Sequence, residues 1–363
     1  MEQKIKVAIV FGGRSTEHAT SLLSAQNVLN SLDLAKFEPV LIGIDKNGCW
    51  HYNENSMSLL NASDANSIAL GKLDQPIILS QNTNDRSIVS KNSNEVITKV
   101  DVIFPVLHGT YGEDGSIQGL AKLANIPVVG CGILGSAVGM DKDIMKRILR
   151  DANINVAKWV TVRQNTDGVN YDDIVQKLGN ELFIKPANLG SSVGVSFTKD
   201  EKSFFKGLES ALTFDPKVII EEKIIGREIE CAVLGNSQPR ASIAGEIIPK
   251  DGFYSFESKY LDEHGAKLSI PAEMSDEQLK AVQKLAIETY QVLECRGMSR
   301  VDMFMQADGT LVINEINTIP GFTNISMYPK LWEHSGLPQQ ELISELIRYA
   351  IEEHEVQNRL KLT

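Results

Sequence analysis

The chain has 363 residues, with 36 lysines and arginines against 47 aspartates and glutamates, and a formal net charge of −11. That length is enough for two or three domains, and a hydrophobic content of 42% is ordinary for packed cores, which excludes collagen-like, disordered and membrane-spanning chains. The acidic balance argues against nucleic acid or an anionic membrane as a partner, because the summed field would repel phosphate polymers.

The cysteines Cys49, Cys131, Cys231 and Cys295 are spread along the chain, without a C-x-x-C pair or a cluster of histidines. Neither a disulfide framework nor a zinc site is therefore indicated. The first apolar run, residues 5–11, is too short and too soon followed by two glycines to be a signal peptide. These features predict a cytoplasmic protein.

The first 138 residues are predicted to form an N-terminal parallel α/β domain. A β-prone run over residues 5–11 ends at Gly-Gly, a helix is predicted over about 16–32, and a second strand over 37–44. This β-α-β beginning indicates a parallel sheet whose ligand groups lie at the carboxyl ends of the strands. Residues 53–94 are rich in Asn and Ser and are expected to be mostly loop, with a short strand near Pro76–Leu79.

Two further domains are expected. Residues 139–218 would form a central domain, which begins with a helix over 141–151 and has strands over 182–185 and 193–197. A strand over 217–222 would lead out of this domain. Residues 219–363 would form a C-terminal domain, in which Ser275 and Gln278 make a capping box at the start of a helix. The fold class is therefore α/β with three domains.

The most informative stretch is a pair of alternating strands separated by Asp-Gly at positions 308–309, a strong hairpin signal. A two-residue turn there would place Asp302 directly opposite Glu315 and Arg300 opposite Asn317, on one face of the sheet. The other face would carry Val301, Met303, Val312 and Ile316.

Two carboxylates placed opposite each other repel, so the pair Asp302 and Glu315 needs a positive charge between them. A hard divalent cation fits, with the Asn317 carbonyl as a third oxygen ligand and room left for water and phosphate oxygens. The alternative is a solvated sheet face on which Arg300 relieves the repulsion.

A phosphate site is indicated around residues 185–194, although no Walker A motif occurs. Lys185 ends a strand and is followed by a loop of small residues, which allow backbone N–H groups and hydroxyls to approach phosphate oxygens. The same loop could be a plain turn, but Lys142 and Lys185 favour phosphate. Residues 12–14 do not fit G-x-G-x-x-G, so dinucleotide binding, with Asp45 at the ribose, is a weak alternative.

Several short motifs recur in a fixed order over some 300 residues, and together they are specific although each is weak alone. The chain resembles the D-alanine–D-alanine ligase family of the ATP-grasp superfamily through Gly12-Gly13-x-Ser15-x-Glu17-His18, His108-Gly109-x-x-Gly112-Glu113-Asp114-Gly115, Met140-Asp141-Lys142, Lys185-Pro186, Gly190-Ser191-Ser192-x-Gly194, Lys259-Tyr260, Arg300-x-Asp302 and Asn314-Glu315-x-Asn317-Thr318-x-Pro320-Gly321.

The resemblance implies an ATP-dependent ligation of two D-alanines for cell-wall precursor synthesis, through a D-alanyl phosphate. It also implies two Mg²⁺ ions, which Mn²⁺ can replace, and a homodimer. The nucleotide and metal residues carried over are Lys142, Lys185, Ser192 and Lys259 for phosphates, Glu221, Glu222, Lys223 and Ile224 for adenine, Glu228 for ribose, and Asp302, Glu315 and Asn317 for the metals.

The substrate residues carried over fall into three groups. The resemblance assigns the first D-alanine to Glu17, Ser191, Tyr260 and His108, the oxyanion to Arg300 and the Gly321 N–H, and the carboxylate of the second D-alanine to Ser326, Met327 and Lys259. A segment from about Gly252 to Lys267 would act as a lid.

Plainer interpretations stand beside these. Glu17 could be only a first-turn helix carboxylate, His108 a core histidine and Tyr260 a packing aromatic. Ala19-Thr20 stands where the family has Glu-Val. At the level of function, the alternatives are an ATP-grasp ligase for another acid or amine, and a nucleotide-binding regulator that has lost its chemistry.

Overall fold

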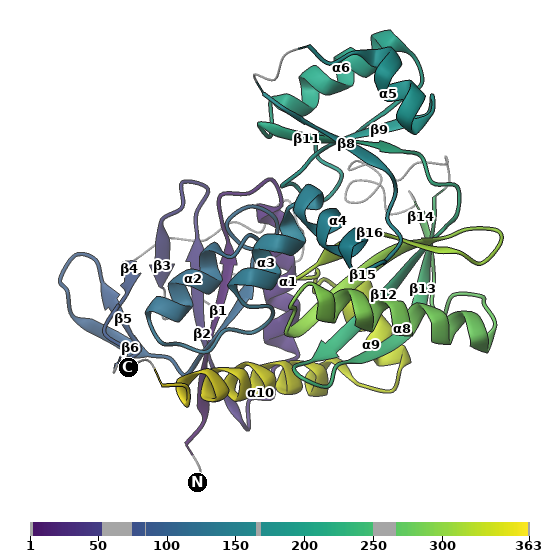
Figure 1. Cartoon of the computed structure of the whole chain (residues 1–363). Helices are drawn as coiled ribbons and strands as arrows, with labels where there is room; N and C mark the ends of the chain where they lie inside the picture. The colour runs from purple at the N-terminus through teal and green to yellow at the C-terminus, as the bar shows by residue number, and fades with distance from the viewer. Residues whose placement is uncertain (1–2, 53–74, 84, 165–167, 250–265, 362–363) are drawn as a thin grey trace.

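The computed structural model describes the whole chain except residues 1–2, 53–74, 84, 165–167, 250–265 and 362–363. Three sheets organise it into an N-terminal unit, a central unit and a C-terminal unit (Figure 1). None of the described helices is both long enough and apolar enough to span a membrane.

The N-terminal sheet has the strand order β6-β5-β4-β3-β2-β1-β7. The strand β1, next to the edge strand β7, pairs in parallel with β2 on one side and β7 on the other, which confirms the predicted parallel pairing. The strands β3 to β6 extend it as antiparallel hairpins. The bounds are β1 Ile5–Gly12, β2 Phe37–Ile44, β3 Trp50–Tyr52, β4 Gln75–Leu79, β5 Ser87–Ser90, β6 Val96–Lys99 and β7 Val102–Val106.

Helices cover both faces of this sheet. The core on one face joins α1 residues to alternate residues of β1, and the core on the other joins α2 residues to the intervening ones. Two further helices lead to the central unit. The bounds are α1 His18–Asn30, α2 Ser116–Leu123, α3 Ile133–Met140 and α4 Lys142–Asp151.

The central unit is an antiparallel sheet of order β10-β9-β11-β8, with its own core under α5 and α6. Figure 1 shows this unit set apart from the other two sheets, at the top of the view. The bounds are β8 Trp159–Arg163, α5 Tyr171–Leu178, β9 Leu182–Pro186, β10 Ser196–Thr198, α6 Glu201–Leu212 and β11 Lys217–Glu222.

The C-terminal unit is an antiparallel sheet of order β14-β13-β12-β15-β16. The predicted capping box of Ser275 and Gln278 is present at the start of its long helix α8. The bounds are β12 Arg227–Gly235, β13 Arg240–Pro249, β14 Ala266–Ser269, α8 Asp276–Val292, β15 Gly297–Met305, β16 Leu311–Asn317, α9 Met327–His334 and α10 Gln339–Asn358.

The final helix α10 belongs to two units at once. Its buried residues Leu342, Leu346 and Ile347 share one hydrophobic core with Phe11 and Leu22 of the N-terminal unit. Figure 1 shows α10 running beneath both the N-terminal and the C-terminal sheets. The N-terminal domain therefore takes part of its core from the end of the chain.

Some sequence predictions of local structure were incomplete. The range 53–94 contains β4, as expected near Pro76–Leu79, but also β5, and β3 lies just before it. These strands have only three to five residues each, so they lack the long apolar runs that identified β1 and β2. The strand expected to begin near Val193 starts only at Ser196, because the preceding residues form turns.

The hairpin of β15 and β16 pairs Asp302 with Glu315 and Arg300 with Asn317, as predicted. The predicted two-residue turn was nevertheless wrong. The amide of Gln306 donates to the Thr310 carbonyl at 2.9 Å, so the turn spans three residues, 307–309. The pairing next to the turn is therefore offset by one residue.

A β-bulge between Asp302 and Met303 on one strand restores the register. The extra residue is Asn314, which lies between the paired residues Ile313 and Glu315. As a consequence Ile313, not Val312 as predicted, joins Met303 in the core. The three-residue turn and the bulge thus shift the register in opposite directions, so Asp302 still pairs with Glu315.

Candidate active site

A cavity of about 380 Å³ lies between the central and C-terminal sheets. Residues predicted from widely separated motifs meet in its wall, so the fold brings them together. Those present are Lys142, Lys185, Ser192, Glu221, Glu222, Lys223, Ile224, Glu228 and Glu315.

A buried ion triad forms one side of this cavity. Glu221, at the end of β11, accepts from Lys185 Nζ at 2.6 Å and from Lys146 Nζ at 2.7 Å. Burial opposes ionisation of Glu221, but the two lysines outweigh it and lower the pKa of Glu221 to about 2. Because Glu221 is ionised, the two lysines and one glutamate together carry one net positive charge. Lys185 and Glu221 line the cavity in which phosphates were predicted to bind.

The linker predicted to meet adenine begins at this triad. The amides of Glu222 and Lys223 donate to the carbonyls of Lys158 and Glu181, both at 3.1 Å. These amides are therefore engaged within the protein, and the next linker residue, Ile224, also lines the cavity.

The small-residue loop closes the cavity with an unusual backbone. Ser191 and Ser192 both have positive φ, at 53° and 59°, followed by Gly194 at 71°. Side-chain-bearing residues occupy this left-handed region at a cost of about 1–2 kcal/mol each, and such strain concentrates at functional sites. Lys142 braces the loop by donating to the Leu189 carbonyl at 2.8 Å.

Three carboxylates stand in a row across the C-terminal sheet, because Glu230 of β12 pairs with Asp302 of β15, which pairs with Glu315 of β16. Arg300 donates to both oxygens of Asp302 at 2.7 Å and lies 3.0 Å from Glu230. Burial disfavours the charged guanidinium, yet Asp302 and Glu230 raise its pKa well above the usual value. Lys142 lies 3.2 Å from Glu315.

This row fits a hard divalent cation by the chemistry of its donors. Asp302 and Glu315 offer carboxylate oxygens, and Asn317 lies beside them with its amide nitrogen 2.9 Å from Asp302. Among the residues that the structure describes, no three His, Cys, Asp or Glu side chains form a preformed metal cage. Ligation here would therefore need water or phosphate oxygens, as Mg²⁺ prefers.

Two of the predicted first-substrate residues meet across a domain boundary. Ser191 of the central unit donates a hydrogen bond to the carboxylate of Glu17, the residue that directly precedes α1 in the N-terminal unit. The Glu17 side chain is buried within this boundary. The resemblance implied a hydrogen-bonded set of Glu17 with Ser191, and the fold brings these two residues into contact.

His108 lies next to this site, and both of its ring nitrogens have partners. Nδ1 lies 3.2 Å from the Ile319 carbonyl, which can only accept, so Nδ1 carries the proton. Nε2 then accepts from the Ser24 hydroxyl at 3.1 Å. Burial lowers the pKa of His108, which keeps the ring neutral. This is the hydrogen-bonded core histidine weighed as the plainer interpretation, at the edge of the substrate site.

Glu113 was quoted within a motif, but no role was predicted for it. Its carboxylate accepts from the Gly109 amide at 2.8 Å and from the Ile319 amide at 3.3 Å. Burial, together with the negative charges of Glu17 and Glu315, raises the pKa of Glu113 to about 8. The side chain thus ties the N-terminal loop to the C-terminal loop that leads to Gly321.

The loop after β16 carries further residues that were predicted to contact substrate. The Ser326 hydroxyl accepts from the Thr323 amide at 2.9 Å, directly beside Gly321. The Met327 side chain is buried in the core, so only its main chain is available to a substrate. Tyr260, Lys259 and the predicted lid lie outside the described residues, apart from the lid's last positions, which begin β14.

Three site residues escaped prediction: Lys146, Glu113 and Glu230. Lys146 lies four residues after Lys142 on α4, so helical spacing could have placed both on one face. Glu230 alternates with Glu228 on β12, which puts both on the same face of the sheet. Only Glu113 lacks such a signal, because its partners are backbone amides of distant loops.

A nucleotide-sized cavity between two antiparallel sheets, lined by paired lysines and acids, defines an ATP-grasp enzyme with an additional N-terminal α/β domain. The family models described as D-ala D-ala ligase N-terminus and C-terminus match residues 6–131 and 148–348. The chain belongs to the D-alanine–D-alanine ligase family.

Individual relatives agree with this assignment. The D-alanine--D-alanine ligase of Shouchella clausii is 51% identical over 359 residues, which cover 99% of this chain and 98% of the relative. The solved D-alanine-D-alanine ligase of Coxiella burnetii superposes with a TM-score of 0.87 at 38% identity, covering 99% and 97% of the two chains. The Bacillus anthracis D-alanine--D-alanine ligase, solved in complex with ATP, gives 0.72 at 25% identity and covers 97% and 99%.

Proposed function

We propose that this enzyme joins two D-alanines with ATP to make D-alanyl-D-alanine, a precursor for the bacterial cell wall. The observation that carries the proposal is the Glu17–Ser191 contact, which puts a carboxylate for an ammonium group beside the loop of the ATP cavity. The named relatives support the choice of D-alanine as substrate.

A carboxylate is a poor acyl donor, because its leaving group would be oxide. Transfer of the γ-phosphoryl of ATP to the carboxylate of the first D-alanine gives an acyl phosphate, from which phosphate can leave. In this scheme Glu17 holds the ammonium of the first D-alanine. Lys142 and Lys185 neutralise the phosphates, and the strained loop at Ser191 and Ser192 lies against them.

The neighbouring residues orient the nucleotide. Glu228 would bind the ribose hydroxyls, and the main chain of the linker from Glu221 to Ile224 would meet the adenine. When bound, Mg²⁺ at Asp302, Glu315 and Asn317 would neutralise phosphate charge. We propose two such ions, with Mn²⁺ able to replace them.

The amine of the second D-alanine then attacks the acyl phosphate and displaces phosphate. Arg300 and the Gly321 amide would stabilise the oxyanion, and losing one such donor typically costs about 10²–10³ in rate. Ser326 and the Met327 main chain, with Lys259, would hold the carboxylate of the second D-alanine. Tyr260 would complete the first-substrate set with Glu17.

Phosphate release from ATP, measured with and without D-alanine, tests the function. We expect release that depends on D-alanine and a product with the mass of the dipeptide. Release without D-alanine dependence would contradict the proposal, and a different product from another acid or amine would point to a ligase of altered specificity.

A pair of variants tests the metal assignment. Glu315→Gln should abolish Mg²⁺-dependent turnover, because it removes one of two facing carboxylates. Glu288→Gln, on the exposed side of α8 where it pairs with Lys284 at 3.7 Å, is the matched control and should keep full turnover. Near-normal turnover of Glu315→Gln would exclude Glu315 as a ligand.

We further propose that the enzyme works in the cytoplasm as a homodimer, with no nucleic acid or membrane partner. The formal net charge of −11 supports the absence of a nucleic acid or membrane partner, because it disfavours binding to phosphate polymers and anionic surfaces. Sedimentation of the full chain at micromolar concentration measures the assembly, and a single species of monomer mass would contradict the dimer.

A further inference from the structure

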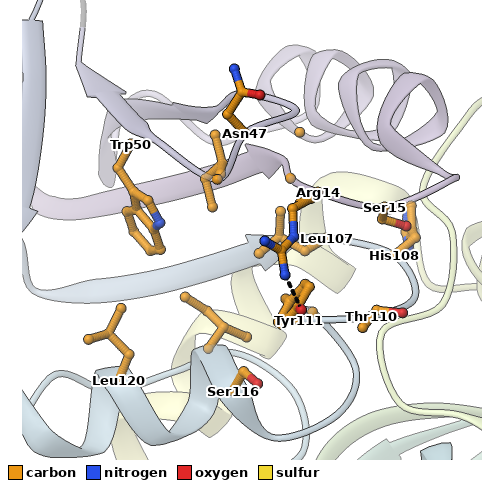
Figure 2. Close-up of a pocket in the computed structure, with 16 residues that line it drawn as sticks. Arg14, Ser15, Asn47, Trp50, Leu107, His108, Thr110, Tyr111, Ser116 and Leu120 are labelled. Atoms are coloured by element: carbon orange, nitrogen blue, oxygen red, sulfur yellow. Dashed lines mark hydrogen bonds between the residues drawn. The ribbon is translucent and has the colours of Figure 1, made fainter. Parts of the chain in front are cut away.

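A second cavity, of about 320 Å³, lies in the N-terminal unit and shares no lining residue with the ATP cavity among the residues described. Figure 2 shows its wall, in which the apolar side chains of Trp50 and Leu120 lie on one side and Arg14, Tyr111 and Ser15 lie on the other, with Leu107 beside Arg14. Of its lining residues, His108 is the one that was assigned to the ligation, at the first D-alanine.

Its position in the fold is one where α/β sheets bind ligands. The cavity lies beyond the carboxyl ends of β1, β2 and β7. The helix α1 that follows β1 and the helix α2 that follows β7 pack on opposite faces of the sheet. Strands whose connections leave to opposite faces open a crevice at their carboxyl ends, which is the usual ligand position in such sheets.

The charge of the cavity defines the polarity of a ligand. Among the lining residues, Arg14 is the only one with a full charge, because His108 is held neutral by burial. Arg14 donates to the Tyr111 hydroxyl, and its guanidinium lies 4.7 Å from the centre of that ring. The nearby Asp114 carboxylate is occupied by the amides of Tyr111 and Ser116, at 2.8 and 3.0 Å.

The apolar wall and the volume define the body of a ligand. Ile44, Trp50, Leu107, Ile117 and Leu120 supply aliphatic and aromatic surface. An engineered apolar cavity of about 150 Å³ binds benzene, so twice that volume suits about two fused rings. An apolar cavity with a single cation at its edge therefore suits a flat, bicyclic anion.

The cavity wall is bonded to the predicted first-substrate residue. The Ser15 hydroxyl, which lines the cavity, accepts from the Glu17 amide at 3.1 Å. The Gly13 carbonyl, also in the wall, accepts from Nδ1 of His18 at 2.7 Å. A ligand that shifts the loop of residues 13–15 would therefore shift the carboxylate of Glu17.

We propose that this cavity is an effector site for a compact planar carboxylate, coupled to the first D-alanine site through the loop of residues 13–15. The coupling rests on the proposed function, whereas the binding site does not. Arg14 pairs with the carboxylate, and Trp50 and Leu120 enclose the rings.

Calorimetric titration of the full chain with 2-naphthoate, without ATP or D-alanine, tests the site. We expect saturable binding of one molecule per chain. Arg14→Gln should weaken it at least 10-fold, and the neutral analogue 2-naphthamide should bind wild type and Arg14→Gln alike. Absence of saturable binding at millimolar concentration, or equal binding of the acid to both proteins, would overturn the proposal.

A second pair of variants locates the ligand. Leu120→Trp fills the cavity from α2 and should abolish binding of 2-naphthoate. Leu123→Trp, on the same helix with its side chain 64% exposed outside the cavity, is the matched control and should bind like wild type. Equal loss in both variants, or in neither, would place the ligand elsewhere and refute the site.

Kinetics test the coupling. Saturating 2-naphthoate should change the KM of wild type for the first D-alanine at least threefold and leave Leu120→Trp unaffected. An unchanged KM with binding intact would refute the coupling. A protein that binds 2-naphthoate in the predicted way but releases no phosphate with D-alanine would contradict the proposed function and leave the site standing.

Discussion

Glu113→Gln is expected to change how the stability of the protein depends on pH. The Glu113 carboxylate accepts two backbone amides, yet burial and its acidic neighbours raise its pKa from 4.5 to about 8. Between these two pH values the unfolded chain loses the proton that the folded chain keeps. The free energy of unfolding of the wild type should therefore fall as the pH rises from about 4.5 to 8.

The size of this effect on the free energy of unfolding follows from the raised pKa of Glu113. One pKa unit corresponds to about 1.4 kcal/mol, so Glu113 costs the folded state about 5 kcal/mol above pH 8 and almost nothing below pH 4.5. Glutamine carries no such cost. Its Nε2, however, cannot accept from an amide, so one of the two backbone N–H groups is left unpaired at a cost of about 1–3 kcal/mol.

The two stability curves should consequently cross. Urea unfolding, followed by circular dichroism with EDTA and without nucleotide, gives the free energy of unfolding at each pH from 5 to 9. Glu113→Gln should be the less stable protein at pH 5 and the more stable at pH 9, whereas Glu288→Gln should run parallel to wild type. A constant difference between Glu113→Gln and wild type across this range would refute the raised pKa.

Other substitutions probe the contacts between the motifs. Lys146→Met leaves the buried Glu221 with Lys185 alone, and should destabilise the protein by about 3–5 kcal/mol in thermal unfolding; a loss below 1 kcal/mol would show that the triad is not a buried ion network. Ser191→Ala removes the donor to Glu17 and should raise the KM of the first D-alanine more than that of ATP. Glu17→Gln should weaken D-alanine binding in calorimetry while ATP binding persists, and the reverse order would count against its role.

The strands that the sequence predicted best are those that can be recognised from their own residues. The bounds of β2 and β11 match the expected ranges, because each is an apolar run ended by a clear break. The short strands β5 and β6 were missed, since each has only four residues and acquires strand geometry only by pairing. The local sequence pattern of a strand does not show which other strand it will pair with.

The hairpin illustrates a second limit. The sequence predicted that Asp302 faces Glu315, and this is confirmed, but through a two-residue turn that does not exist. The three-residue turn and the bulge at Asn314 compensate each other. Asn314 also accepts from Lys185 at 3.2 Å, so the bulge aims a polar group at the ATP cavity. Turn residues indicate a reversal of the chain, and only the pairing of the strands fixes its length.

The helix α10 has a consequence for how the protein is made. The core of the N-terminal unit includes Phe11 and Leu22 but also Leu346 and Ile347 from the last helix. His354 adds a hydrogen bond from the end of α10 to Asn125, at 2.9 Å. During synthesis the first domain leaves the ribosome with part of its apolar core uncovered, and it stays so until nearly the whole chain has been translated. A message truncated before α10 would therefore yield a protein with an exposed apolar core, prone to aggregation even though its first sheet is complete.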